Sequence, residues 1–299
     1  MTGRPLCIND QGMSALPPLE VRQPARQTLP LVLSSPHSGE NYPADFIAAS
    51  RLDRLALRRS EDSFVDELFA AAPALGAPLI RALFPRAYVD PNREPWELDP
   101  AMFEDPLPSY VNASSPRVAA GLGTIAKVVA NGEEIYGGKL RFADAKARIE
   151  RCYRPYHAAL AEAVGATHRR FGRCVLIDCH SMPSVGGPQE RDAGRDRVDF
   201  VLGDCFASAC APAIVERVER ILKGQGFVVA RNAPYAGGYV TQHYGRPSAG
   251  VHALQIEINR ALYMDETLLS RGPGFARMAE TMTGLIREIG RMFPVVLAE

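Results

Sequence analysis

Short apolar runs alternate along this chain with longer segments in which apolar residues recur at helical spacing. Residues 31–35, 174–182 and 251–260 have the composition of strands that are buried on both faces. Shorter runs at 197–204 and 227–235 are predicted as further strands. Strands interleaved with helices are typical of a mostly parallel or mixed sheet that helices cover on both faces. The pattern therefore predicts an α/β fold.

The predicted helices are punctuated by residues that start, end or bend helices. Pro43 suits a helix start and Gly76 a helix end, and Pro155 predicts a kink or a break in the longest helical segment. Two short extended runs, 77–83 and 86–93, follow the first helical segment. The helical segments are 43–75, 142–172, 209–226 and 275–293.

The chain shows no internal repeat and no clear linker, so we expect a single catalytic α/β domain over residues 29–299. Residues 1–28 are polar and rich in proline, which predicts an N-terminal arm on the surface. Residues 94–138 are rich in Pro, Gly, Asn and Ser and have little periodicity. A segment of that length inside a compact domain is usually a functional insertion or a lid.

The charge balance excludes some partners. Lysine plus arginine equal aspartate plus glutamate at 34 each, and 46% of the 299 residues are hydrophobic. We therefore expect a large core and neither a nucleic-acid partner nor a membrane surface. No signal peptide or membrane-spanning run is apparent.

Cysteine usage points to a reducing compartment. The six cysteines form no CxxC pair, which favours free thiols in a cytoplasmic protein. Cys179 precedes His180, but adjacent strand residues point to opposite faces. The two therefore cannot form a nucleophile–base pair, and we expect Cys179 in the core.

Polar side chains collect where the predicted strands end. In open α/β sheets, ligands bind just beyond the carboxyl ends of the strands. Histidines, carboxylates and arginines are frequent at these ends, which predicts a functional site there. The segments are 36–40, 90–93, 180–182 and 257–260.

His37 and Glu40 have HxxE spacing, and His180 ends a distant strand. Two imidazoles and a carboxylate are a set that catalytic zinc sites use, with the fourth position open to water. Zinc lowers the pKa of bound water to about 7, which produces hydroxide at neutral pH. The pattern predicts one zinc ion, although other divalent metals also suit these ligands.

Glu257 lies among apolar residues of a predicted buried strand. Burying a carboxylate there costs several kcal/mol unless it has a partner. One reading is a structural salt bridge, and the other is a general base beside an activated water. The sequence leaves both open.

The remaining histidines carry weaker signals. His243 lies in the glycine-rich segment "GGYVTQHYG", where a site role and a structural role are both open. The others are expected to be structural: His157, His168 and His252.

Taken together, six motifs resemble the N-formylglutamate amidohydrolase (N-formylglutamate deformylase) family, in the order expected of it. The resemblance runs from about Leu31 to beyond Met264. Single motifs are weak, but six in order are specific. They are "SPHSGENYP", "SEDSFVDELF", "AYVDPNREP", "IDCHSMP", "GGYVTQHYGRP" and "LQIEINRALYMDE".

The resemblance implies a fold and a metal site. The family is similar to the zinc carboxypeptidases and aspartoacylases, with a phosphorylase/hydrolase-like three-layer α/β/α sandwich around a mixed, mostly parallel sheet. It implies one zinc on His37, Glu40 and His180. It also admits Asp62, in "RRSEDSF", as the carboxylate ligand, and we rank Glu40 first because of its spacing.

The resemblance also implies a reaction. Glu257 would be the catalytic base, and Asn92 with Arg93 would hold a carboxylate of a small anionic N-acyl amino acid. Beyond the resemblance, we predict His243 and Arg246 as further substrate-binding residues. The candidates for a second carboxylate are Arg246 and Arg260, although Arg260 could instead hold the loop at Asn259. The expected reaction cleaves N-formyl-L-glutamate to formate and L-glutamate, in amino-acid catabolism.

Two alternatives stay open at this point. A related metallo-deacylase or carboxypeptidase would use the same metal and base on another acyl group or a longer substrate. A non-catalytic binding protein would keep the pocket but lose the base or a ligand, and here all of these residues are present.

Overall fold

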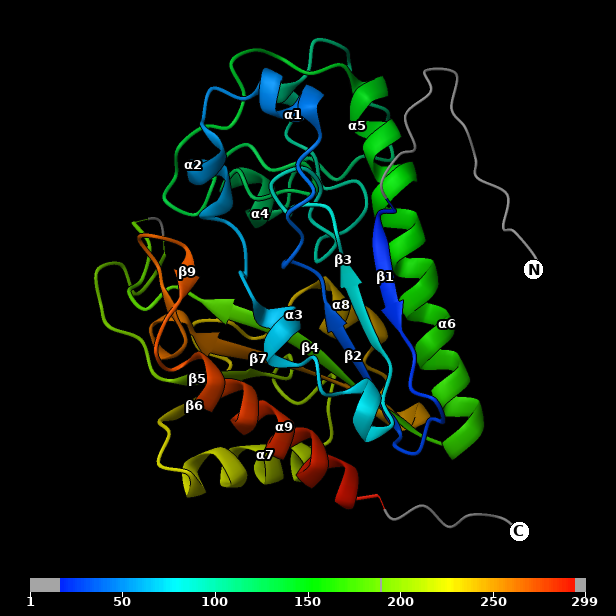
Figure 1. Cartoon of the computed structure of the whole chain (residues 1–299). Coiled ribbons are helices and arrows are strands. Elements are labelled where there is room, and N and C mark those ends of the chain that lie inside the picture. The colour runs from blue at the N-terminus through cyan, green and yellow to red at the C-terminus, as the bar shows by residue number, and fades with distance from the viewer. Residues whose placement is uncertain (1–16, 189, 294–299) are drawn as a thin grey trace, which may run out of the picture.

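A computed structural model describes residues 17–188 and 190–293 of the chain. Within them, a seven-stranded sheet has the order β1-β3-β2-β4-β7-β5-β6 (Figure 1). The pairs β1–β3 and β5–β7 are antiparallel, and the other four pairs are parallel. The predicted mixed, mostly parallel sheet is thus confirmed. The strands are β1 (Leu19–Arg22), β2 (Leu31–Ser35), β3 (Leu79–Ala82), β4 (Cys174–Met182), β5 (Phe200–Gly203), β6 (Val229–Arg231) and β7 (Val251–Asn259).

Helices cover both faces of this sheet because its central strands are apolar on both sides. In β2, Leu31 and Leu33 face one core while Val32 faces the other. The first core packs against α3 (Val65–Leu68), α7 (Pro212–Gly224) and α9 (Phe275–Arg291), and α7 and α9 lie side by side in Figure 1. The second packs against α6 (Arg154–Phe171) on the opposite face. Cys179 is fully buried in the first core, as predicted.

The two long helical segments are each interrupted. Residues 43–75 form α1 (Ala44–Ala49), α2 (Arg54–Arg58) and α3, with Asp53 accepting a hydrogen bond from Ala56 N at the start of α2. Residues 142–172 form α5 (Phe142–Arg148) and α6, joined by a π-helical turn, Ile149–Tyr153. Pro155 is the second residue of α6, but the backbone is already helical at Tyr153 and Arg154, so its missing N–H removes one bond from a continuous helix. The predicted kink or break takes the form of a π-helical turn just before the proline.

Two segments differ from their sequence-based predictions. Residues 86–93, expected to be extended, form turns in which Tyr88 N and Val89 N donate to Pro85 O. The glycine-rich segment around His243 contains a short helix, α8 (Tyr239–Tyr244). Both cases depend on tertiary contacts: Val240 N, in the first turn of α8, donates to Asn92 Oδ1.

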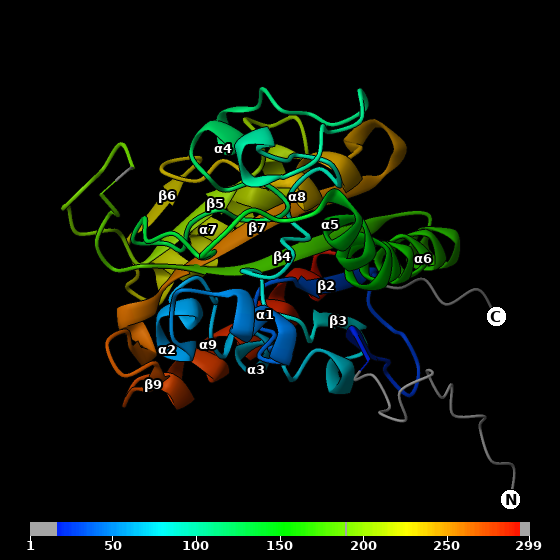
Figure 2. The same cartoon turned by 90° about the horizontal axis from the view of Figure 1, so that it is seen from above.

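The insertion 94–138 is irregular but ordered by hydrogen bonds to its neighbours. It contains one α-helical turn, α4 (Pro116–Ala119), with Ser115 Oγ accepting from Val118 N, and one 3₁₀ turn, Pro100–Met102. Glu97 O accepts Thr124 N and thereby ties the two ends of a long loop together. The insertion lies over the ends of the central strands in Figure 2.

Part of the expected N-terminal arm belongs to the sheet. β1 pairs with β3, and residues 1–16 lie outside the described part of the chain. The chain also forms a small hairpin of β8 (Met264–Asp265) and β9 (Ser270–Arg271) before α9. Among the described helices, none has the length and hydropathy that a membrane crossing needs.

Candidate active site

Two loops at the carboxyl end of the sheet carry the first polar side chains of the site. His37 follows β2, and Asp62 lies in the turn between α2 and α3. Asp62 N donates to His37 O at 3.1 Å, and Ser38 Oγ donates to Asp62 O at 2.9 Å. These bonds hold the two loops together and fix the position of the Asp62 carboxylate next to the His37 ring.

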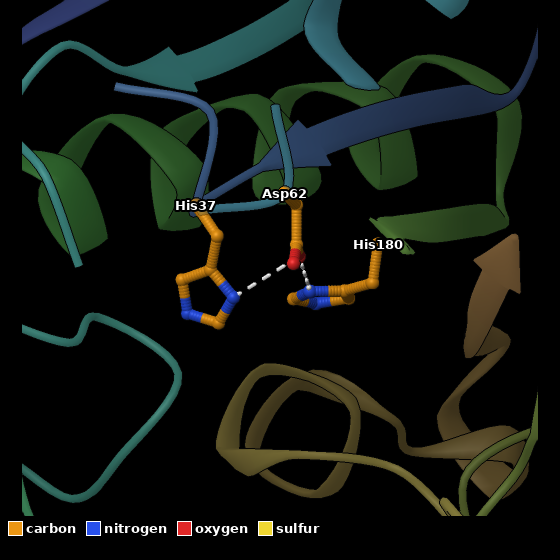
Figure 3. Close-up of side chains that lie close together, drawn as sticks. All are labelled: His37, Asp62 and His180. Carbon is orange, nitrogen blue, oxygen red and sulfur yellow. Dashed lines mark hydrogen bonds and ion pairs between the residues drawn. The ribbon is translucent and has the colours of Figure 1, made fainter. Parts of the chain in front are cut away.

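His180 reaches the same point from β4 (Figure 3). Asp62 Oδ2 lies 3.3 Å from His37 Nδ1 and 2.9 Å from His180 Nδ1. One ligand atom from each of the three residues lies within 4.8 Å of the others, and all three side chains are buried. The three groups form a set that can hold a metal ion.

The structure does not bring Glu40 into this cluster, so the preference for Glu40 over Asp62 is corrected. Gly39 passes so close to the backbone of Phe84 that a Cβ would lie 2.2 Å from its carbonyl oxygen. Asn41 N donates to Leu83 O at 2.9 Å on the other side of Glu40. With both neighbours held, the Glu40 side chain is 57% exposed, and its carboxylate lies 3.6 Å from Arg58.

Each histidine also has a second carboxylate on its other ring nitrogen. His37 Nε2 lies 2.7 Å from Asp90 Oδ1, and His180 Nε2 lies 3.0 Å from Asp178 Oδ2. Such partners fix the tautomer and the orientation of a metal-binding imidazole. The sequence analysis did not predict this role of Asp178. The available signal was its spacing from His180, because residues two apart in a strand point to the same face.

The electrostatics of Asp62 follow from its partners. Burial alone would raise the pKa of Asp62, but hydrogen bonds from His180 and His37 outweigh it and hold the pKa well below its usual range. Arg260 Nη2 adds a contact of 3.1 Å to Asp62 Oδ1. The carboxylate is therefore charged in the folded protein, as a metal ligand must be.

Glu257 lies on β7 beside His180, its register partner on β4. Its Oε1 accepts a hydrogen bond from Gln255 Nε2 at 2.8 Å, while its Oε2 is buried without a partner among the described residues. Burial raises the pKa of Glu257 to about 7, against the opposing charge of His180. No arginine or lysine lies within ion-pair distance of it in the described part of the chain, so the structural salt bridge is not formed.

These residues line one cavity of about 390 Å³, within the usual range for small-molecule sites. Segment 117–132 of the insertion and residues 234–238 form parts of its wall. Four arginines also line the cavity: Arg86, Arg93, Arg117 and Arg260. Sequence reasoning missed Arg86 and Arg117, since neither stands at the end of a predicted strand.

Asn92 and Arg93 lie in the cavity but are more engaged than expected. Asn92 Oδ1 accepts Val240 N, and Asn92 Nδ2 lies 3.1 Å from His180 Nε2. Arg93 donates through Nε to Leu122 O and through Nη1 to Asn92 O, and its Nη2 lies 3.7 Å from Asp90. Arg93 thus has one amino group that is not committed to a close hydrogen bond.

His243 and Arg246 are not brought to the cavity. Both side chains are exposed, and the His243 ring stacks on Tyr239 with ring centroids 4.8 Å apart. His157, predicted to be structural, donates or accepts at both ring nitrogens, with Pro91 O at 2.8 Å and Tyr244 Oη at 3.0 Å. It supports the turn that carries Asn92 from outside the cavity.

Comparisons with known proteins show which family this chain resembles. The family model described as N-formylglutamate amidohydrolase matches residues 29–264. N-formylglutamate deformylases of Pseudomonas aeruginosa and Pseudomonas putida are 30% and 28% identical, over 90% and 80% of this chain and 94% and 83% of theirs. A crystal structure of N-formylglutamate amidohydrolase from Ralstonia eutropha JMP134 is 40% identical with a TM-score of 0.84, covering 93% of this chain and 99% of that one.

A more distant structure, a gene product of Agrobacterium tumefaciens, shares the fold at 20% identity, with a TM-score of 0.65 over 91% of this chain and 94% of its own. The family model covers most of the chain, and it includes both histidines, Asp62 and Glu257. The relatives with the higher identities are named N-formylglutamate deformylase or N-formylglutamate amidohydrolase. The chain therefore belongs to the N-formylglutamate amidohydrolase family.

Proposed function

We propose that this protein hydrolyses the amide bond of N-formyl-L-glutamate to give formate and L-glutamate, with one zinc ion held by His37, Asp62 and His180. The observation that carries the proposal is the buried His–Asp–His cluster beside a carboxylate, Glu257, that has an unpartnered oxygen. Relatives named N-formylglutamate deformylase support the choice of substrate.

The residues present fit a zinc ion. Two imidazole nitrogens and one carboxylate oxygen are a common catalytic set, and the carboxylates of Asp90 and Asp178 orient the two rings. If this buried group held no cation, the Asp62 carboxylate would accept hydrogen bonds from ring N–H groups of both histidines. When bound, zinc supplies Lewis acidity that polarises a carbonyl oxygen and acidifies water. We expect no role for Glu40 in this site because it faces solvent.

Glu257 is suited to proton transfer. With a pKa raised to about 7, it is partly ionised at neutral pH and can both accept and release a proton. It takes a proton from the water whose oxygen attacks the formyl carbon. It then delivers that proton to the amide nitrogen as the C–N bond breaks, which releases glutamate as an amine. Gln255 holds Oε1 of Glu257, and Glu257 is one of the residues that line the cavity.

The cationic wall of the cavity suits an anionic substrate. Arg86 and Arg93 share the Asp90 carboxylate, which leaves more positive charge on that wall than Asp90 neutralises. A guanidinium group matches a carboxylate with two parallel hydrogen bonds. Arg93, through its uncommitted amino group, binds the substrate carboxylate nearest the amide. A protein with no net charge can thus still select an anion.

The direct test is formate release from N-formyl-L-glutamate by chelator-treated protein, before and after one equivalent of zinc. We expect turnover only after zinc is restored, and turnover about 10²- to 10⁴-fold slower from the Glu257→Gln variant under the same conditions. A panel of N-formyl, N-acetyl and longer N-acyl glutamates then separates a deformylase from a related deacylase. Tight zinc uptake without release of formate would reject this substrate.

A further inference from the structure

One arginine of the cavity wall stands apart from the other three. Arg86 donates to Asp90 at 2.8 Å, Arg93 donates to two backbone carbonyls, and Arg260 donates to Asp62 and Ser181. The side chain of Arg117 makes no hydrogen bond to any described residue, and its nearest carboxylate, that of Glu97, lies 3.7 Å away. Its side chain is 34% exposed although it lines the cavity.

The position of Arg117 is nevertheless fixed by its backbone. It lies in the first turn of α4, which Ser115 caps, and the next residue, Val118, is buried. Arg117 O accepts Leu122 N at 2.8 Å, and Leu122 O accepts Arg93 Nε at 2.8 Å. The insertion thus links the backbone of Arg117 to Arg93 through Leu122, and both arginines line the same cavity.

The charges around Arg117 favour an anionic ligand. Glu97, its one acidic neighbour within 4 Å, is 2% exposed and already accepts Glu94 N at 3.1 Å. Repulsion from Arg86 and Arg117 adds to burial in lowering the pKa of Arg93 to about 10. A second substrate carboxylate bound between Arg93 and the solvent would relieve this repulsion and supply the missing hydrogen bonds of Arg117.

We propose that Arg117 binds the side-chain carboxylate of the substrate and so sets the preference for acidic over neutral N-acyl amino acids. This inference rests on the proposed function, in which Arg93 takes the carboxylate next to the amide. A chain of contacts leads from His37 to the two proposed carboxylate sites. His37 contacts Asp90, Asp90 contacts Arg93, and Leu122 links Arg93 to Arg117. Arg117, rather than Arg246 or Arg260, is then the second anion site.

The test compares N-formyl-L-glutamate with N-formyl-L-glutamine, which differs only by a neutral side-chain amide. We expect Arg117→Gln to lower kcat/KM for the glutamate substrate by about 10- to 100-fold, because it loses a charge-assisted pair, and to change the glutamine substrate less than about threefold. Arg117→Lys should keep part of the preference for N-formyl-L-glutamate over N-formyl-L-glutamine. Arg141→Gln is the matched control, since Arg141 is exposed and pairs only with Asp144.

A binding measurement keeps this inference separate from the deformylase proposal. Calorimetry on the zinc-loaded protein compares glutarate with its monoamide, glutaramate, neither of which has an N-formyl group. Tighter binding of glutarate that disappears in Arg117→Gln supports the anion site even if no formate is released from any substrate. An equal loss of kcat/KM for both substrates in Arg117→Gln overturns the inference. A preference for glutarate that is unchanged in the variant, or absent from the wild type, also overturns it.

Discussion

Asp62 and Glu257 are both buried carboxylates in one cavity, yet their surroundings shift their pKa values in opposite directions. Asp62 meets two imidazoles and a guanidinium group, and its pKa is held well below the usual range. Glu257 meets one amide, and burial raises its pKa to about 7. The difference lies in the partners and not in the depth of burial.

The comparison shows how one pocket assigns two tasks to the same functional group. A carboxylate that stays charged suits a cation, whereas one that titrates near neutrality suits a proton. The loop after β2 and the strand β4 supply Asp62 with its two histidine partners, whereas Glu257 Oε2 on β7 has no partner among the described residues. Substitutions at the two positions should therefore fail in different ways.

The largest effect is expected from Asp62→Asn. The variant loses the anion that both histidines contact and leaves Arg260 buried without its carboxylate. We expect no tight zinc and no zinc-dependent formate release, together with a loss of about 3 kcal/mol or more in the free energy of unfolding of the metal-free protein. Metal analysis after gel filtration and urea denaturation measure these effects. One zinc per chain in Asp62→Asn would contradict the assignment.

Glu257→Gln should abolish chemistry while keeping the metal. Gln preserves the shape of the side chain and removes only the proton acceptor, so we expect kcat to fall by about 10²- to 10⁴-fold. Zinc content should stay at one per chain, in contrast to Asp62→Asn. Single-turnover formate release and metal analysis of both variants, side by side, provide the comparison. A parallel loss of zinc in both would remove the distinction between them.

The raised pKa of Glu257 also predicts a pH dependence of stability in the metal-free protein. The folded state keeps a proton on Glu257 that the unfolded chain releases above its ordinary pKa of 4.5. The stabilising contribution is thus complete below pH 4.5 and is lost as the pH rises through about 7. Relative to Glu257→Gln, the free energy of unfolding of the wild type should fall by on the order of 3 kcal/mol as the pH rises from 4.5 to 8.

Urea denaturation of chelator-treated wild type and Glu257→Gln at several pH values measures this loss. Titrating groups that do not interact with Glu257 cancel in the difference between the two proteins, because they are common to both. A difference that does not change between pH 4.5 and pH 8 would show that Glu257 titrates normally, and the contrast with Asp62 would then disappear.

The regular part of the fold and three of the site residues could be predicted from the sequence. β2, β4 and β7 are short runs dominated by apolar residues, as is typical of strands buried on both faces. His37, His180 and Glu257 stand at or near the ends of those runs, and parallel strands bring such ends together. Local pattern and sheet topology were enough there.

The remaining site residues depend on loop paths that no local pattern encodes. The HxxE spacing favoured Glu40, but close packing of Gly39 against Phe84 turns that side chain outward. Asp62 enters the site through backbone bonds to His37, across 25 positions of sequence. Arg117 comes from an aperiodic insertion, whose contacts with Arg93 appear only in the folded chain.

The smallest effect is expected from Glu40→Gln. A variant that behaves like the wild type would support Asp62 over Glu40 as the carboxylate ligand. Glu40 is exposed and contacts Arg58 at 3.6 Å, and such surface pairs contribute roughly 0–1 kcal/mol. Zinc content and kcat/KM for N-formyl-L-glutamate should therefore stay within about twofold of the wild type, because surface substitutions rarely reach a buried site. Metal analysis and formate release measure both, with Asp62→Asn carried through the same preparation. Loss of zinc from Glu40→Gln, with zinc kept in Asp62→Asn, would return the ligand role to the HxxE motif and reverse the order of the two carboxylates.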